Sequence, residues 1–118
     1  MFTEAFPIVT VPSIARILQF YVGLLGFRQT YAFPPTGEPA FVVLRLGTSD
    51  LGFGADPLAP PANEFELCIY ADDCDTEVTR LRSSGVLVIE DPSDQPWGER
   101  MARVLDPAGN RVMIVSRK

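Results

Sequence analysis

The chain has 118 residues with 10 basic and 15 acidic side chains, so its formal net charge is −5 at pH 7, and it contains no histidine. This length suits one modest domain, and the lack of histidine excludes a Ser-His-Asp triad, a Cys-His dyad and an imidazole metal site. The acidic balance disfavours nucleic acid as a partner and suits a cationic ligand, although mild acidity also serves solubility alone.

The two cysteines, Cys68 and Cys74, do not indicate a disulfide framework. The first residues lack the basic segment of a secretory signal, and no apolar run approaches the roughly 20 residues of a membrane-spanning helix. We therefore expect a cytoplasmic protein with reduced thiols and no membrane partner. Cys68 lacks a histidine base, so we expect it to be a small buried apolar residue rather than a nucleophile.

The first half of the chain predicts one helix among four strands. Ser13 is a candidate N-cap, apolar residues follow it at helical spacing, and Gly26 is suited to end the helix in the left-handed conformation. The expected strands are residues 6–11, 27–33, 41–46 and 50–53, and residues 56–63, with three prolines, are expected to form a linker.

The second half predicts the same order, with a helix that starts near Asp73 and ends at Gly85. The expected strands are residues 64–70, 86–89, 101–105 and 112–115, with a loop at 91–96 and a turn at 106–110. Four acids at the start of this helix resemble a metal cluster at first sight: Asp72, Asp73, Asp75 and Glu77. Capping and the helix dipole also select acids there, and we favour that explanation.

The two halves are copies in layout. Asp72 follows Ser13 by 59 residues, and Gly85 follows Gly26 by 59 residues. We therefore predict an α+β fold of two tandem βαβββ units, residues 1–58 and 63–118, which form a curved mixed β-sheet cleft within a single domain, residues 1–118. The units are expected to depend on each other, because domains of about 60 residues bury only about 60% of their unfolded surface.

Four short segments occur in an order and spacing that resemble a known family. They are FY at residues 20–21, LGF at 25–27, PWG at 96–98 and DPAGN at 106–110. Together they resemble the signatures of the vicinal oxygen chelate superfamily, which includes glyoxalases, bleomycin-resistance proteins and extradiol dioxygenases. The PWG segment is similar to that of the bleomycin-binding members in particular. The FY pair also suits the core of a helix and DPAGN suits a β-turn, so these motifs argue for the fold, and function must come from the site.

The resemblance also implies where a metal would be held. Enzymes of this superfamily bind a divalent metal with up to four side chains, usually His or Glu, on the first and last strands of each unit. These positions correspond to Phe6, Gly52, Glu66 and Met113, with Asp50 as an alternative to Gly52 if the register differs. Only the carboxylates suit a hard cation, so we expect no metal and no other cofactor.

Glu66 has two interpretations that the sequence leaves open. Alternation along its strand places Glu64, Glu66 and Cys68 on one face, which should line the cleft. There the Glu66 carboxylate would have a raised pKa or hold a cationic group of a ligand. It could equally pair with an arginine of the same sheet, such as Arg103.

The aromatic residues favour a binding protein. In the bleomycin-binding proteins that this chain resembles, aromatic rings at the positions of Trp97 and Phe41 stack on flat rings of the drug. Trp97 could instead fill the core beneath its loop, and Phe33 and Phe53 are expected to favour the core. The predicted ligand-binding residues are Trp97, Phe41, Glu66, Phe6, Phe53, Met113 and Phe33.

The sequence thus predicts a metal-free protein that sequesters a planar, cationic antibiotic in clefts of a homodimer. One alternative is a metal-dependent enzyme of the glyoxalase or dioxygenase type. The other is a degenerate dimeric module that binds no small molecule.

Overall fold

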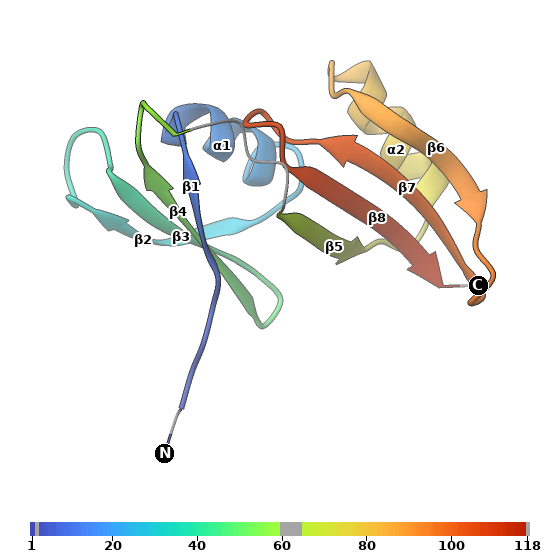
Figure 1. Ribbon diagram of the computed structural model, residues 1–118, viewed down its shortest axis with the longest axis horizontal. Helices are drawn as coiled ribbons and strands as arrows, with labels where there is room; N and C mark the ends of the chain where they lie inside the picture. The colour runs from blue at the N-terminus through green and yellow to red at the C-terminus, as the bar shows by residue number, and fades with distance from the viewer. Residues whose placement is uncertain (2, 60–64, 118) are drawn as a thin grey trace. The chain divides into compact units, whose positions relative to one another are not determined.

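The computed structural model describes residues 1, 3–59 and 65–117. The chain divides into two compact units, Met1–Pro61 (unit 1) and Ala62–Lys118 (unit 2). Each unit contains one four-stranded mixed sheet and one helix, and Figure 1 shows these elements in chain order.

Unit 1 contains β1 (Ile8–Val11), α1 (Ile14–Tyr21), β2 (Arg28–Phe33), β3 (Phe41–Leu46) and β4 (Ser49–Ala55). Its strand order is β1-β4-β3-β2. The first strand pairs in parallel with the last, and the other pairs are antiparallel.

Unit 2 contains β5 (Glu66–Tyr70), α2 (Cys74–Ser83), β6 (Val88–Asp94), β7 (Glu99–Leu105) and β8 (Arg111–Arg117). Its strand order is β5-β8-β7-β6, with the same parallel pairing of its first and last strands. The α+β class and the repeated βαβββ layout predicted from the sequence are therefore confirmed.

One predicted loop is wrong, because β6 continues through Asp94 and includes Pro92. The strand lies at the edge of its sheet, and its register with β7 shifts between Glu90 and Ser93. Proline lacks the N–H that a central ladder needs, but an edge strand with an irregular register tolerates it. Glu64 and linker residues 60–63 lie outside the described residues.

The acids at the start of α2 have structural roles. The Asp73 carboxylate caps the helix by accepting a hydrogen bond from the backbone N–H of Thr76 at 3.2 Å. Glu77 pairs with Arg80 at 2.7 Å, one turn along the helix. Within the described residues, no group of three or more His, Cys, Asp or Glu side chains could hold a metal ion. The capping explanation is therefore confirmed.

The turn between β7 and β8 is built by Asp106. Its Oδ1 accepts hydrogen bonds from the backbone N–H groups of Ala108 and Asn110 at 2.9 and 2.8 Å. Its Oδ2 accepts a third from the Asn110 side-chain amide at 2.8 Å, and Gly109 supplies a φ of 86°. The DPAGN segment thus stabilises the fold, as a β-turn explanation requires.

The core of unit 1 centres on Tyr21, which is fully buried at the end of α1. Its ring contacts Phe20 and Phe27 edge-on, with centroid distances of 4.9 and 5.5 Å. The centroid of the Phe53 ring also lies 4.9 Å from that of Tyr21, and Phe53 is itself fully buried. The core interpretation of Phe53 is therefore confirmed, and its buried ring is not accessible to a ligand.

No helix in the described part of the chain has the length and apolar character that crossing a membrane requires.

The packing predicts different costs for two phenylalanines of unit 1. Phe53→Ala should lower the free energy of unfolding by about 3–5 kcal/mol, because it leaves a cavity beside Tyr21. Phe33→Ala is the matched control, because the Phe33 side chain is 58% exposed. It should change that free energy by only about 0.5 kcal/mol. Urea unfolding of both variants measures the difference, and equal losses would contradict the assignment of Phe53 to the core.

Candidate functional site

The face of the unit 1 sheet that points away from α1 carries aromatic side chains. Along β3, Val42 and Leu44 are fully buried, and α1 packs against this strand. Phe41 alternates with them and lies on the open face. The strand register places Phe33 opposite Phe41, and the Tyr31 ring meets Phe41 edge-on with a centroid distance of 6.1 Å.

Gly52 lies beneath this aromatic cluster. A Cβ atom added to Gly52 would lie 3.2 Å from the Phe6 ring, 3.2 Å from the Ile8 side chain and 3.3 Å from the Phe41 ring. Any larger residue would therefore displace the two rings. We call Phe6, Tyr31, Phe33 and Phe41 the aromatic face; the exposed fractions of Phe6 and Tyr31 are 41% and 51%.

The open face of unit 2 carries ion pairs in the corresponding place. The Arg103 Nε donates to Glu66 at 2.7 Å, and its Nη1 donates to both Glu90 oxygens at 2.9 and 3.0 Å. Its Nη2 lies 3.6 Å from the Met113 sulfur. The pKa of Arg103 is raised. The largest cause is its hydrogen bond with Glu66, and the bonds with Glu90 add to it. Of the alternatives for Glu66, the structure thus shows the pair with an arginine of its own sheet.

The donor set at the implied metal positions does not fit a hard divalent cation. The two positions in unit 1 carry a phenyl ring and a glycine, and the two in unit 2 both contact the Arg103 guanidinium. Asp50, the alternative position, receives two hydrogen bonds from Arg45 at 2.7 and 2.9 Å, which lower the pKa of this carboxyl group. These residues therefore do not provide the oxygen ligands that a hard divalent cation needs.

Trp97 lies at the turn between β6 and β7, and its side chain is 60% exposed, so the interpretation as a core residue is wrong. The turn is closed by hydrogen bonds from Gln95 N–H to the Glu99 carbonyl at 2.8 Å and from Gly98 N–H to the Gln95 carbonyl at 3.0 Å. The indole N–H donates to the Glu99 carboxylate at 2.9 Å. The ring is thus exposed but held in orientation.

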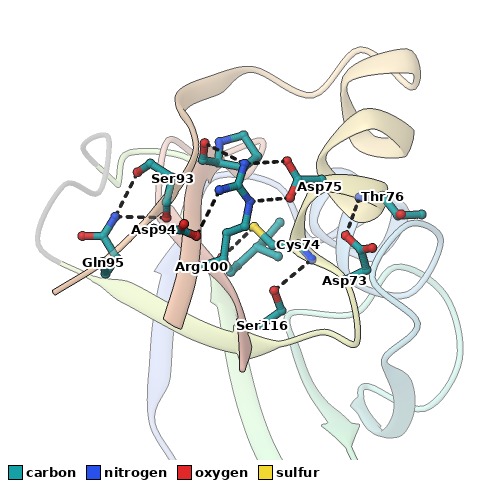
Figure 2. A network of polar contacts seen from close by, with 11 residues as sticks. Asp73, Cys74, Asp75, Thr76, Ser93, Asp94, Gln95, Arg100 and Ser116 are labelled. Atoms are coloured by element: carbon teal, nitrogen blue, oxygen red, sulfur yellow. Dashed lines mark hydrogen bonds and ion pairs between the residues drawn. The ribbon is translucent and has the colours of Figure 1, made fainter. Parts of the chain in front are cut away.

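Arg100 ties the strand before this turn to the start of α2, as Figure 2 shows. Its guanidinium donates to both Asp75 oxygens at 2.5 and 3.0 Å and to Asp94 at 3.1 Å. The pKa of Asp75 is lowered, first by its hydrogen bonds with Arg100. A third contact reaches the Pro92 carbonyl at 3.4 Å. The end of β6, next to the Trp97 turn, is therefore held by the Arg100 side chain of β7, which Asp75 of α2 holds in turn.

Cys68 is exposed, so the expectation that it is buried is wrong, while Cys74, the first residue of α2, is buried. Both thiols are free. The pKa of Cys68 is raised by partial burial and then by the negative charges of Glu99 and Glu66.

The structure brings together Phe6, Phe33 and Phe41 in unit 1, and Glu66 and Met113 in unit 2 through Arg103. Their roles toward a ligand remain predictions. The sequence reasoning missed four open-face residues: Tyr31, Tyr70, Glu99 and Arg117. Strand alternation could have found Tyr70, which lies four residues after Glu66 in β5.

The raised pKa of Cys68 predicts slow thiol chemistry. Because only the thiolate reacts, native protein should react with a disulfide reagent such as DTNB more slowly than free cysteine at pH 8, with its pH midpoint displaced upward. Glu99→Gln should accelerate the reaction by about twofold or more, since it removes one of the two charges. Glu90→Gln is the control, because Glu90 is engaged by Arg103. A pH profile identical to that of free cysteine would contradict the shift.

Comparison with known proteins agrees with this architecture. Residues 5–114 match the family model of the Glyoxalase/Bleomycin resistance protein/Dioxygenase superfamily. A bleomycin resistance protein of Klebsiella pneumoniae is 30% identical over 89 residues, which are 69% of this chain and 71% of the relative.

Two solved structures show the same fold. A superfamily member from Sphaerobacter thermophilus aligns with a TM-score of 0.81 at 22% identity, over 99% of this chain and 98% of that chain. The bleomycin resistance determinant encoded on the transposon Tn5 aligns with a TM-score of 0.74 at 24% identity, over 99% of each chain. The motifs, the repeated fold and the family match agree: the chain belongs to the Glyoxalase/Bleomycin resistance protein/Dioxygenase superfamily.

Proposed function

We propose that this protein binds a small molecule without a metal, and that it sequesters a planar, cationic antibiotic of the bleomycin type in clefts of a homodimer. The observation that carries the proposal is the Trp97 ring, which is 60% exposed while its indole N–H is held by Glu99. A ring held in this way offers a flat surface for stacking and loses little conformational freedom when a ligand binds.

The aromatic face of unit 1 supports the same mode of binding. Three of its rings, those of Phe6, Tyr31 and Phe33, are exposed, and a group of exposed apolar side chains at one place is typical of a binding site. Stacking on each ring contributes about 0.5–1.5 kcal/mol beyond the burial of its area. Phe6, Phe33 and Phe41 of the aromatic face are therefore proposed to contact the ligand, together with Trp97.

Of the two roles that the sequence left open for Glu66, the proposal does not use the one in which it holds a ligand cation. Because Arg103 neutralises Glu66 at 2.7 Å, this carboxylate is not available to a ligand cation. Glu66 and Met113 are proposed to line the site beside the guanidinium. Attraction for a positively charged ligand then has to come from other acids and from the net charge of −5.

The lack of a suitable metal donor set supports binding rather than metal-dependent catalysis. Sequestration breaks no bond, so it needs neither a nucleophile nor a base. The two units are proposed to act as one domain, and a two-fold symmetric dimer would create two equivalent sites. The 30% identity to a bleomycin resistance protein supports this choice of ligand class.

A bleomycin-type glycopeptide, kept metal-free with a chelator, should raise the melting temperature and quench the fluorescence of Trp97. A ligand at 100 times its dissociation constant stabilises a protein by about 2.7 kcal/mol. Trp97→Ala should weaken binding by about tenfold or more, because a stacked ring and its buried area are lost. Thermal shift and titration calorimetry measure both effects.

The matched control is Leu87→Ala, because the Leu87 side chain is 61% exposed in the same unit and lies outside the proposed contacts. It should leave the affinity unchanged. The proposal fails if the glycopeptide produces no thermal shift, or if the two substitutions weaken binding equally.

Elemental analysis separates the proposal from a metal-dependent enzyme. After dialysis against Mn²⁺, Ni²⁺ or Zn²⁺ and then against buffer, the protein should retain far less than one ion per chain. Near-stoichiometric retention would contradict a metal-free site.

A further inference from the structure

One end of the unit 2 sheet gathers four side chains that the proposed function uses only in part. Tyr70 ends β5 and Arg117 ends β8, and these strands are parallel, so both residues lie at the same end of the sheet. Glu99 begins the antiparallel β7 directly opposite Arg117. Trp97 precedes it by two residues in the turn. We call these four residues, Tyr70, Trp97, Glu99 and Arg117, the Glu99 cluster.

Glu99 orients both aromatic rings of the cluster. Its carboxylate accepts the indole N–H of Trp97 at 2.9 Å. The pKa of the Tyr70 phenol is raised, first through hydrogen bonding with this same carboxylate and then by burial. Both donors are neutral, so these bonds position the carboxylate without cancelling its charge. Glu66 differs in this respect, because its carboxylate faces a guanidinium.

Arg117 shows what the Tyr70 ring can bind. Its guanidinium carbon lies 3.9 Å from the centroid of that ring, which is a cation–π contact. The Tyr70 and Trp97 side chains nevertheless remain 47% and 60% exposed. Two accessible aromatic surfaces therefore flank a charged carboxylate, and a planar cation from the same chain rests on one of them.

We propose that Tyr70, Trp97 and Glu99 bind a planar cationic group, an amidinium or guanidinium, and that Arg117 is an internal competitor which this group displaces from the Tyr70 ring. The inference rests on the proposed function, in which this site receives the cationic part of the ligand while flat rings stack elsewhere. Glu99 is then the carboxylate that binds the ligand cation, a role that Glu66 cannot have because it is paired with Arg103.

The geometry favours a planar cation over other charged groups. An amidinium or guanidinium can stack on a ring and donate two parallel hydrogen bonds to a carboxylate. A tetrahedral ammonium loses the stacking contact, and an anion is repelled by Glu99. Arg117 already makes the stacking half of this interaction.

Benzamidinium and benzamide form the matched pair of probes, because they share shape and differ in charge. Trp97 is the only tryptophan of the chain, so its fluorescence reports on this site alone. Benzamidinium should change the emission in a saturable manner that weakens with added salt. Benzamide at equal concentration should produce no saturable change. Equal responses to the two probes would overturn the proposal.

Two pairs of variants test the roles of the charged residues. Arg117→Gln should tighten benzamidinium binding about two- to fivefold, since the competing cation–π contact is removed. Arg111→Gln is its control, because it changes the net charge equally on the same strand. Glu99→Gln should weaken binding about tenfold, whereas Glu90→Gln should not. If Arg117→Gln and Arg111→Gln behave alike, Arg117 does not compete and the proposal is wrong.

The outcomes distinguish this inference from the proposed function. If the glycopeptide raises the melting temperature but benzamidinium does not bind, the cation site is wrong and sequestration stands. If benzamidinium binds with the predicted dependence on Glu99 and the glycopeptide does not bind, the site stands and the ligand class is wrong. Melting curves of each variant without ligand verify the fold, and Arg117→Lys, which keeps the charge without planarity, should give binding between wild type and Arg117→Gln.

Discussion

Within the described residues, each sheet of this protein packs against a single helix, so a helix of its own unit covers only one of its two faces. In unit 1, α1 covers the face that carries Val42, Leu44 and Phe53, and in unit 2, α2 buries Cys74, Val78 and Leu81. The parallel pairing of the first and last strands of each unit makes this arrangement possible, because the helix crosses over between strands that run the same way. Every candidate site residue except Phe53 lies on a sheet face that no helix of its unit covers, or at an end of such a face.

The repeat preserves the backbone and changes the chemistry of these open faces. Ile8 pairs with Gly52 in unit 1 as Cys68 pairs with Met113 in unit 2, so Phe6 corresponds to Glu66. In the first unit the absence of a side chain at Gly52 leaves room for the rings of Phe6 and Phe41 to pack against its backbone. In the second, a guanidinium lies against the equivalent positions. The open face of unit 1 is therefore suited to stacking, whereas ion pairs with Arg103 hold the side chains on the open face of unit 2.

Two arginines of unit 2 each form ion pairs with two acidic side chains from different elements. Arg100 joins Asp75 of α2 to Asp94 of β6, and Arg103 joins Glu66 of β5 to Glu90 of β6. Each guanidinium is planar and permanently charged, so it can bind two carboxylates that would otherwise repel each other. Both pairs anchor the edge strand that leads to the Trp97 turn, which explains how an exposed ring can have a defined orientation.

The sequence by itself determined the repeated βαβββ layout, the caps of α2 and the DPAGN turn. These features depend on local chemistry: glycine at positive φ, acids at a helix start, apolar residues at regular spacing. Only the tertiary structure decided between the two interpretations of Glu66, showed that Trp97 and Phe33 are exposed while Phe53 is buried, and brought Tyr70, Glu99 and Arg117 to one end of a sheet. Strand order and register set these contacts, and both depend on pairing between residues far apart in the sequence, such as Tyr70 with Val115. The predicted loop at residues 91–96 was wrong for the same reason. Its prolines argue against a central strand, but only the neighbouring strands show that β6 lies at the edge of its sheet.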